Sequence, residues 1–274
     1  MKFLKHNILL LICSFTLLTS CSEYQKLLNG DDFGKKYKVA ETYYNQGEFR
    51  KANRLFEQVK PKYRGKPQAE RLVFFLADSY YQIKDYYLAA HEYENFVKSY
   101  PKSQRILEAY FKSAKSYYLM SPKFSLDQEE TYTAIEKLQI FINTYPTSEY
   151  SKEANQLILE LQTKLERKDF EISKQYFTIK DYKAAIEACT NFIASYPGTK
   201  FREEALFVKF EASYTIAINS IASKKLERLK ELNQQYQTII RYYPEPIFME
   251  KLTGMMDKAN QEIENIEIIN STTK

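Results

Sequence analysis

Apolar and polar positions recur with a helical period along most of this chain. Ala77 is followed three positions later by Tyr80, and Ala89 is followed four positions later by Tyr93. Residues three and four apart lie on the same face of an α-helix, so these pairs mark buried helical stripes. Glycine and proline, which interrupt helices, number only 6 and 8 in 274 residues. The pattern predicts an all-α protein.

The helical pattern is also repeated. The segment Ile83–Pro101 returns as Ile179–Pro197, with the Ile-Lys-Asp-Tyr start and the Ser-Tyr-Pro end unchanged. A second motif, Tyr-Pro-x-Ser/Thr-x-x-x-x-Glu-Ala, begins at Tyr100, Tyr145 and Tyr196. The period and residue types match the tetratricopeptide repeat (TPR), a pair of antiparallel helices of about 34 residues. We therefore expect a TPR superhelix of about five helix pairs over residues 34–270, closed by a C-terminal capping helix near 247–269.

Details of each repeat predict where its helices approach and end. Small residues allow helices A and B to pack closely, and a large apolar residue fills the space beside them. The proline after each helix B prevents its continuation. We expect an inserted loop around 121–127, and the hydroxyl residues that follow the prolines are predicted to cap the next helix; these are Ser103, Ser148 and Thr199.

The first 20 residues have the layout of a secretory signal peptide. Lys2 and Lys5 precede an apolar run over 8–18, which is too short to span a bilayer. The following Leu-Thr-Ser-Cys, ending at Cys21, resembles the bacterial lipobox, in which the cysteine is acylated after cleavage. This resemblance implies lipid attachment at Cys21 and a polar tether over 21–33. A signal peptide with an unmodified cysteine is the alternative.

Charge and cysteine content restrict the partners and the means of stabilisation. Removal of Lys2 and Lys5 with the signal lowers the formal net charge from +5 to +3. Acidic and basic residues remain interleaved, so we expect no nucleic-acid partner. With Cys21 acylated, Cys189 is the single remaining thiol, so we expect stability to come from packing and not from a disulfide.

Aromatic residues of the first three repeats form two series with a spacing of 37. One series is Tyr37, Phe74 and Phe111, and the other is Tyr44, Tyr81 and Tyr118. Members on one helix are seven apart and therefore share a face. In a TPR superhelix this direction is the concave groove, so the two series form a candidate peptide-binding ladder. The alternative is that superhelical packing buries these rings.

Residues suited to catalysis or metal binding are scarce. His91 lies on a helix B and is expected to be exposed, while Cys189 occupies a core position and is expected to be inert. No Cys/His cluster has metal-ligand spacing, and the glycines form no phosphate-binding loop. We predict that the protein is not an enzyme and uses no metal or cofactor.

The third repeat resembles a known family. Asp127-Gln128-x-x-Thr131-x-x-Ala134 and the following segment 141–154 are similar to the BamD family of outer-membrane assembly lipoproteins in Gram-negative bacteria. The resemblance implies an outer-membrane lipoprotein that faces the periplasm and aids insertion of β-barrel proteins. It also implies two partners, namely a BamA-like β-barrel subunit, bound through C-terminal repeats, and unfolded outer-membrane proteins. An inserted stretch near 219–232 departs from the family pattern, so no C-terminal contact residue is transferred.

Two other envelope scaffolds fit parts of the pattern. A periplasmic coordinator shares the Tyr-Pro-x-Ser motif, but that family carries a coiled coil for which residues 22–34 are too few. Glycan-uptake binding lipoproteins also use these repeats, although they are much longer and favour tryptophan, which is absent here. Both remain alternatives at the level of sequence.

Overall fold

A computed structural model describes residues 23–272 of the chain, so the predicted signal peptide and Cys21 lie outside the described residues. The described part is helical and contains no strand, which confirms the all-α prediction. A short helix covers residues 23–29. The longer helices are α2 (Phe33–Asn45), α3 (Phe49–Tyr63), α4 (Ala69–Gln82), α5 (Tyr86–Ser99), α6 (Ile106–Met120), α7 (Glu129–Thr144), α8 (Ser151–Thr178), α9 (Tyr182–Ser195), α10 (Arg202–Ile218), α11 (Ala222–Tyr242) and α12 (Met249–Thr272).

The helices divide into two compact units. Within the described chain, unit 1 comprises residues 23–122 and 128–158, and unit 2 comprises residues 123–127 and 159–272. The 28-residue helix α8 contributes its first turns to unit 1 and the remainder to unit 2. The predicted inserted loop connects α6 to α7, and part of it belongs to unit 2.

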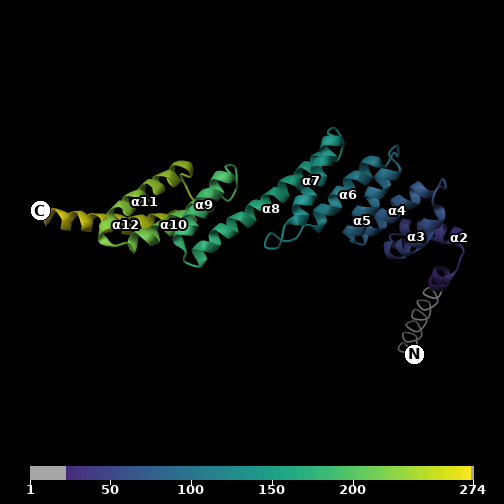
Figure 1. Ribbon diagram of the computed structural model, residues 1–274, viewed down its shortest axis with the longest axis horizontal. Helices are drawn as coiled ribbons and strands as arrows, with labels where there is room; N and C mark the ends of the chain where they lie inside the picture. The colour runs from purple at the N-terminus through teal and green to yellow at the C-terminus, as the bar shows by residue number, and fades with distance from the viewer. Residues whose placement is uncertain (1–22, 273–274) are drawn as a thin grey trace, which may run out of the picture. The chain divides into compact units, whose positions relative to one another are not determined.

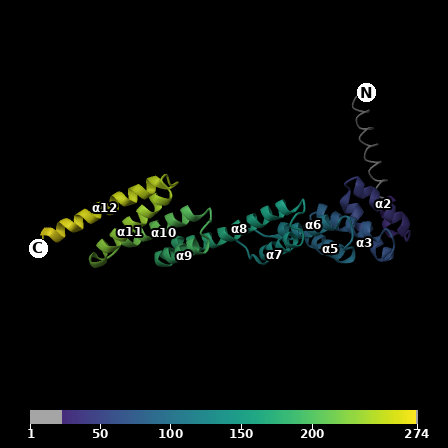
Figure 2. The same cartoon turned by 90° about the horizontal axis from the view of Figure 1, so that it is seen from above.

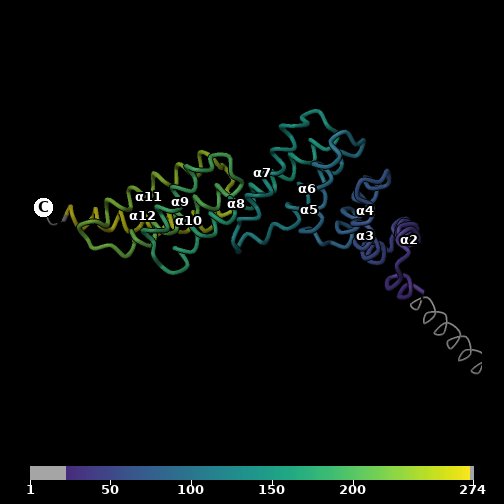
Figure 3. Tube along the Cα trace, turned by 45° about the vertical axis from the view of Figure 1, so that its right-hand side comes forward, coloured from purple at the N-terminus to yellow at the C-terminus, as the bar shows by residue number. Residues whose placement is uncertain are grey.

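Unit 1 is a stack of helix pairs in which each helix packs against the next, from α2 to α7 (Figures 1 and 3). The small helix A residues Ala40, Ala77 and Ala114 are at most 1% exposed, which lets the paired helices approach closely. The large helix B residues predicted to fill the space beside them are fully buried; these are Phe56, Tyr93 and Leu138. The repeat pattern therefore predicts the core of unit 1 correctly.

The repeated Ile-Lys-Asp-Tyr motif forms the turn inside a helix pair. Lys84 and Lys180 adopt the left-handed conformation, with φ of 67° and 66°, and end the preceding helices. The next residue caps the following helix, since Asp85 accepts a hydrogen bond from the Leu88 amide and Asp181 accepts one from the Ala184 amide. The repeat thus encodes a helix end and a helix start in two successive residues.

The hydroxyl residues after the prolines do not act as the predicted helix caps. Ser103, Ser148 and Thr199 each accept a hydrogen bond from the amide two residues later, in a turn that precedes the helix. The residues at the N-cap positions of α6 and α10 are Arg105 and Phe201, neither of which makes a side-chain cap. The cap prediction is wrong because the turn after proline extends further than the sequence pattern indicates.

The segment expected to be a tether packs against the first helix pair. Within the helix at 23–29, Leu28 is buried, and its carbonyl accepts a hydrogen bond from the Lys36 ammonium at 2.9 Å. The Tyr24 hydroxyl donates to the Lys51 carbonyl of α3 at 3.0 Å. This segment is therefore part of unit 1 and not an extended linker.

Unit 2 contains most of α8, the helices α9 to α12 (Figure 2) and residues 123–127. Phe170 of α8 packs with Cys189 of α9 and Val208 of α10. Three residues of the predicted capping helix, α12, are buried in a second cluster, namely Leu252, Met256 and Ala259. None of the helices among residues 23–272 combines the length and apolar content needed to cross a bilayer.

Candidate functional site

The first aromatic series lies in the core of unit 1. Tyr37, Phe74 and Phe111 are only 8%, 2% and 3% exposed. Each ring is covered by the end of helix B of its own pair, where the contacting residues are Tyr63, Phe96 and Phe141, respectively. The assignment of these three residues to an open groove is wrong. In an antiparallel pair the start of helix A faces the end of helix B, which buries the N-terminal member of each pair of aromatics.

The second aromatic series is half-buried. Tyr44 stacks on Phe75 with ring centroids 4.2 Å apart, and Tyr81 makes edge contacts with Tyr86 and Tyr93. Tyr118 is also partly exposed near the end of α6. Their exposure is consistent with a binding surface, and their use as one stays a prediction.

A buried carboxylate, Asp78 of α4, connects three other helices of unit 1. It is 3% exposed and accepts hydrogen bonds from the hydroxyls of Tyr44 and Tyr93, at 2.6 and 2.8 Å, and from the Lys112 ammonium at 2.6 Å. Burial by itself would raise the pKa of Asp78, but the hydrogen bonds from Lys112 and Tyr44 outweigh it and lower that pKa. Asp78 therefore stays ionised and fixes the position of Tyr44.

Lys112 of α6 completes this network. Its ammonium also binds Glu108 at 2.8 Å, one turn earlier on the same helix. Burial tends to lower the pKa of Lys112, but hydrogen bonds to Asp78 and Glu108 raise it overall. The ammonium also lies 5.8 Å from the centre of the Tyr81 ring. The network thus contacts two of the three half-buried tyrosines.

A basic pocket lies beside this network. It has a volume of about 450 Å³ and lies among α4, the end of α5 and the connection to α6. Arg105 covers the Phe74 ring at 4.4 Å, and Arg71 covers the Phe75 ring at 5.0 Å while pairing with Glu41. Guanidinium groups stacked on rings keep their N–H edges free for carbonyl or carboxylate oxygens. We call this the α4–α6 pocket; its lining includes Glu70, Arg71, Phe74, Phe96, Lys102 and Arg105.

Sequence reasoning missed the charged part of this site. Asp78 and Lys112 both lie on helices A and are 34 residues apart, close to the repeat spacing, which is the signal that could have found them. Arg71 and Arg105 are also 34 apart. A periodic search restricted to aromatics overlooks such pairs.

The residues considered for chemistry have ordinary surroundings. His91 is exposed, and Cys189 is fully buried. Burial raises the pKa of the Cys189 thiol to about 11, against a smaller opposing effect of Lys209. Within residues 23–272, no group of three or more His, Cys, Asp or Glu side chains is arranged to hold a metal ion.

The paired helices and their buried alanine stripe define the class of protein, which is a TPR-type helical repeat protein. The model of the outer membrane lipoprotein family YfiO matches residues 31–229, and the chain belongs to this family. Relatives named outer membrane protein assembly factor BamD occur in several bacteria. The Caulobacter vibrioides protein is 24% identical to this chain, and the alignment covers 66% of this chain. The chain thereby spans only 59% of the length of that relative.

Further relatives and solved structures are similar to this chain to different extents. The BamD proteins of Pasteurella multocida and Haemophilus influenzae are each 22% identical; the alignments cover 69% and 78% of this chain and 76% and 86% of those proteins. Among solved structures, the TPR2AB domain of yeast Sti1 has a TM-score of 0.37 and 13% identity, over 83% of this chain and 98% of that one. A TPR protein of Thermus thermophilus has a TM-score of 0.31 and 15% identity, and the alignment covers 84% of this chain and 99% of that protein.

Proposed function

We propose that this chain is a subunit of the β-barrel assembly machinery and serves as a scaffold and receptor for the folding and insertion of β-barrel proteins into the outer membrane. The observation that carries the proposal is the family match over 31–229, together with relatives named as outer membrane protein assembly factors. The protein acts by binding and carries out no catalysis. It is held by acylated Cys21 and faces the periplasm.

The peptide-binding part of this function belongs to unit 1. The half-buried rings of Tyr44, Tyr81 and Tyr118 offer flat apolar contacts, and the α4–α6 pocket offers the N–H groups of Arg71 and Arg105. An extended segment of an unfolded outer-membrane protein carries aromatic side chains and unpaired backbone carbonyls, which match these two kinds of contact. The Asp78 network holds the surface in place before the ligand arrives.

Capture from the native envelope tests this proposal. The lipidated protein is purified from detergent-solubilised membranes of its host, and co-purifying proteins are identified by mass spectrometry. Recovery of a large BamA-like β-barrel subunit supports the assembly function, whereas recovery of a glycan importer would contradict it. The variant Cys21→Ser should leave the membrane fraction while keeping its helical content.

The proposed receptor surface is tested separately with an aromatic-rich peptide from an outer-membrane β-barrel strand. Arg105→Gln removes one guanidinium from the α4–α6 pocket and should weaken binding about tenfold, the range for a charge-assisted hydrogen bond. Arg241→Gln removes an exposed charge from α11 of unit 2 and serves as the matched control. Equal binding by the two variants would remove the α4–α6 pocket from the function.

A further inference from the structure

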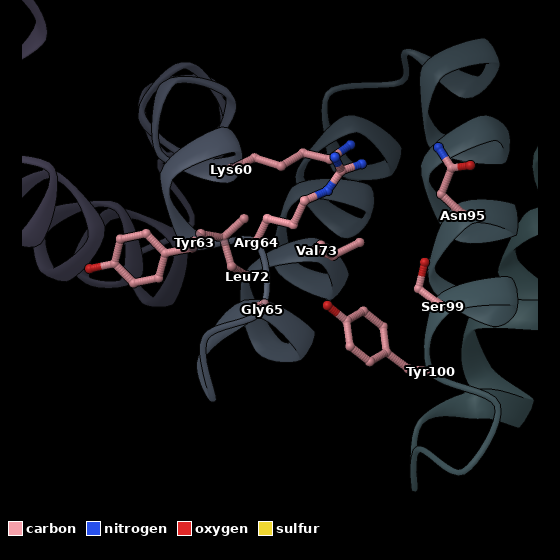
Figure 4. A pocket seen from close by; sticks show the side chains of 10 residues that line it. Lys60, Tyr63, Arg64, Gly65, Leu72, Val73, Asn95, Ser99 and Tyr100 are labelled. Atoms are coloured by element: carbon pink, nitrogen blue, oxygen red, sulfur yellow. The ribbon is translucent and has the colours of Figure 1, made fainter.

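A second pocket in unit 1 lies among the end of α3, the start of α4 and the face of α5. Its volume is about 430 Å³, within the range of roughly 300–1,000 Å³ that ligand pockets occupy. Buried Ala69 and Leu72 and half-buried Val73 supply apolar lining. Figure 4 shows the Arg64 side chain and the Tyr100 hydroxyl turned toward the space in front of α5. We call it the α3–α5 pocket.

The polar side chains that line this pocket can all donate hydrogen bonds. Arg64, Asn95, Ser99 and Tyr100 line it, and none of their side chains makes a hydrogen bond or ion pair within residues 23–272. Burial raises the pKa of Tyr100, and nearby Glu70 adds to this effect, so the hydroxyl stays protonated as a donor. Arg64 can only donate hydrogen bonds, and the side chains of Asn95, Ser99 and Tyr100 can donate as well as accept, so the pocket can serve an acceptor-rich ligand.

The fourth repeat has an acceptor at the equivalent place. Tyr100 corresponds to Tyr196, whose hydroxyl donates to the Asp169 carboxylate at 2.5 Å. With the same spacing of 96 residues, Asp169 corresponds to Val73, which lines the α3–α5 pocket. The fourth repeat therefore carries its own carboxylate partner for the tyrosine, and the second repeat has an apolar side chain there instead.

Charge at the pocket also favours an acidic ligand. Lys60, Lys62, Arg64 and Lys66 follow one another at the end of α3 and just beyond. Lys60 is neutralised by Glu92 at 2.5 Å, while Lys62 lies over the Phe33 ring and Lys66 over the Tyr63 ring. Lys62 and Lys66 are exposed and do not line the pocket. Arg64 is left as the uncompensated charge of the pocket.

We propose that the α3–α5 pocket binds a polypeptide segment of a partner protein that presents an acidic side chain next to a large apolar one. The carboxylate accepts hydrogen bonds from Arg64 and the Tyr100 hydroxyl, as Asp169 does from Tyr196 in the fourth repeat. The apolar side chain lies on Leu72 and Val73. This site is separate from the α4–α6 pocket, and the two share no lining residue.

Ligand-observed NMR titration of the full chain in detergent tests the proposal with two small probes. One is a tripeptide of leucine, glutamate and leucine with both ends blocked, and the other has glutamine in place of glutamate. The glutamate peptide should bind about tenfold more tightly, because only it supplies a charged acceptor. Equal binding of the two peptides, or no binding of either, would overturn the proposal.

Three variants locate the binding. Arg64→Gln should weaken the glutamate peptide about tenfold, and Val73→Asp should do the same by supplying the internal carboxylate seen in the fourth repeat. Arg50→Gln, which removes an exposed charge from the other end of α3, should leave binding unchanged. Circular dichroism confirms that each variant is folded. Unchanged binding by Arg64→Gln, which alters an exposed side chain, would place the ligand elsewhere and refute the site.

A phosphate probe distinguishes a lipid headgroup from an acidic peptide. Glycerol 3-phosphate should bind at least tenfold more weakly than the glutamate peptide, because it has no apolar group to cover Leu72 and Val73. Tighter binding of glycerol 3-phosphate that depends on Arg64 would instead assign the pocket to an anionic headgroup and overturn the peptide proposal.

Discussion

At the scale of single residues, Asp78 shows how one buried charge can position a surface. Its carboxylate is shared by donors from α2, α5 and α6, which ties consecutive helix pairs together. A buried carboxylate is tolerable only when it is paired. The donors to Asp78 come from three other helices and, through Gln82, from the next turn of α4. The 3.6-residue helical period does not reveal this network, because its partners lie 15 and 34 residues away, and only a search at the repeat spacing indicates the pairs that are 34 apart.

Asp78→Asn should lower the free energy of unfolding by about 2 kcal/mol at pH 7, because Lys112 loses its buried partner. The folded pKa of Asp78 lies below the usual value of 3.8. The stabilisation is therefore complete above that value and is lost as the pH falls through the lower, folded pKa. Urea unfolding of wild type and variant should show a difference that shrinks below about pH 4. A difference that grows toward acid pH would contradict this account.

The two aromatic series should respond differently to truncation. Phe74→Ala removes a ring that is 2% exposed and should cost about 3–5 kcal/mol of stability. Tyr81→Ala removes a half-buried ring and should instead weaken binding of an outer-membrane protein peptide with little loss of helicity. Thermal unfolding and peptide titration of both variants check the distinction. A fall in melting temperature as large for Tyr81→Ala as for Phe74→Ala would make Tyr81 a core residue.

At the scale of helices, the sequence predicts some features and not others for identifiable reasons. The small and large core positions repeat within each pair, so periodicity finds Ala40, Ala77 and Ala114 correctly. The burial of Tyr37, Phe74 and Phe111 depends on the end of a different helix, which the pattern of helix A does not contain. The composition of residues 23–29 predicts a polar tether, because it does not contain the contacts that this helix makes with Lys36 and Lys51.

The caps within the repeated turns make a quantitative prediction. Asp85→Ala should cost about 1 kcal/mol, because the first turn of α5 loses its side-chain acceptor. Asp257→Ala, at an exposed position within α12, should change stability by less than about 0.5 kcal/mol. Denaturant midpoints of the two variants compare the effects directly. Equal midpoints would show that Asp85 does not cap α5 in solution.

At the scale of the molecule, the repeats predict the stacked helix pairs but not the division of the chain into two compact units. The sequence predicts stacked helix pairs and a terminal capping helix, and α12 fills that place in unit 2. The repeat pattern does not indicate where the two units meet in the sequence, because the boundary falls inside the single helix α8. The proposed function rests on family membership and on the surface of unit 1, and the lipid anchor is expected at Cys21.

Site-specific photocrosslinking in the native host tests the central claim, that unit 1 receives unfolded outer-membrane proteins, most directly. A photoreactive amino acid replaces Tyr81, or, as a control, Tyr87, which is 73% exposed on α5. We predict adducts between position 81 and newly made outer-membrane β-barrel proteins, with few or none from position 87. Absence of such adducts at position 81, or equal yields from both positions, would contradict the account.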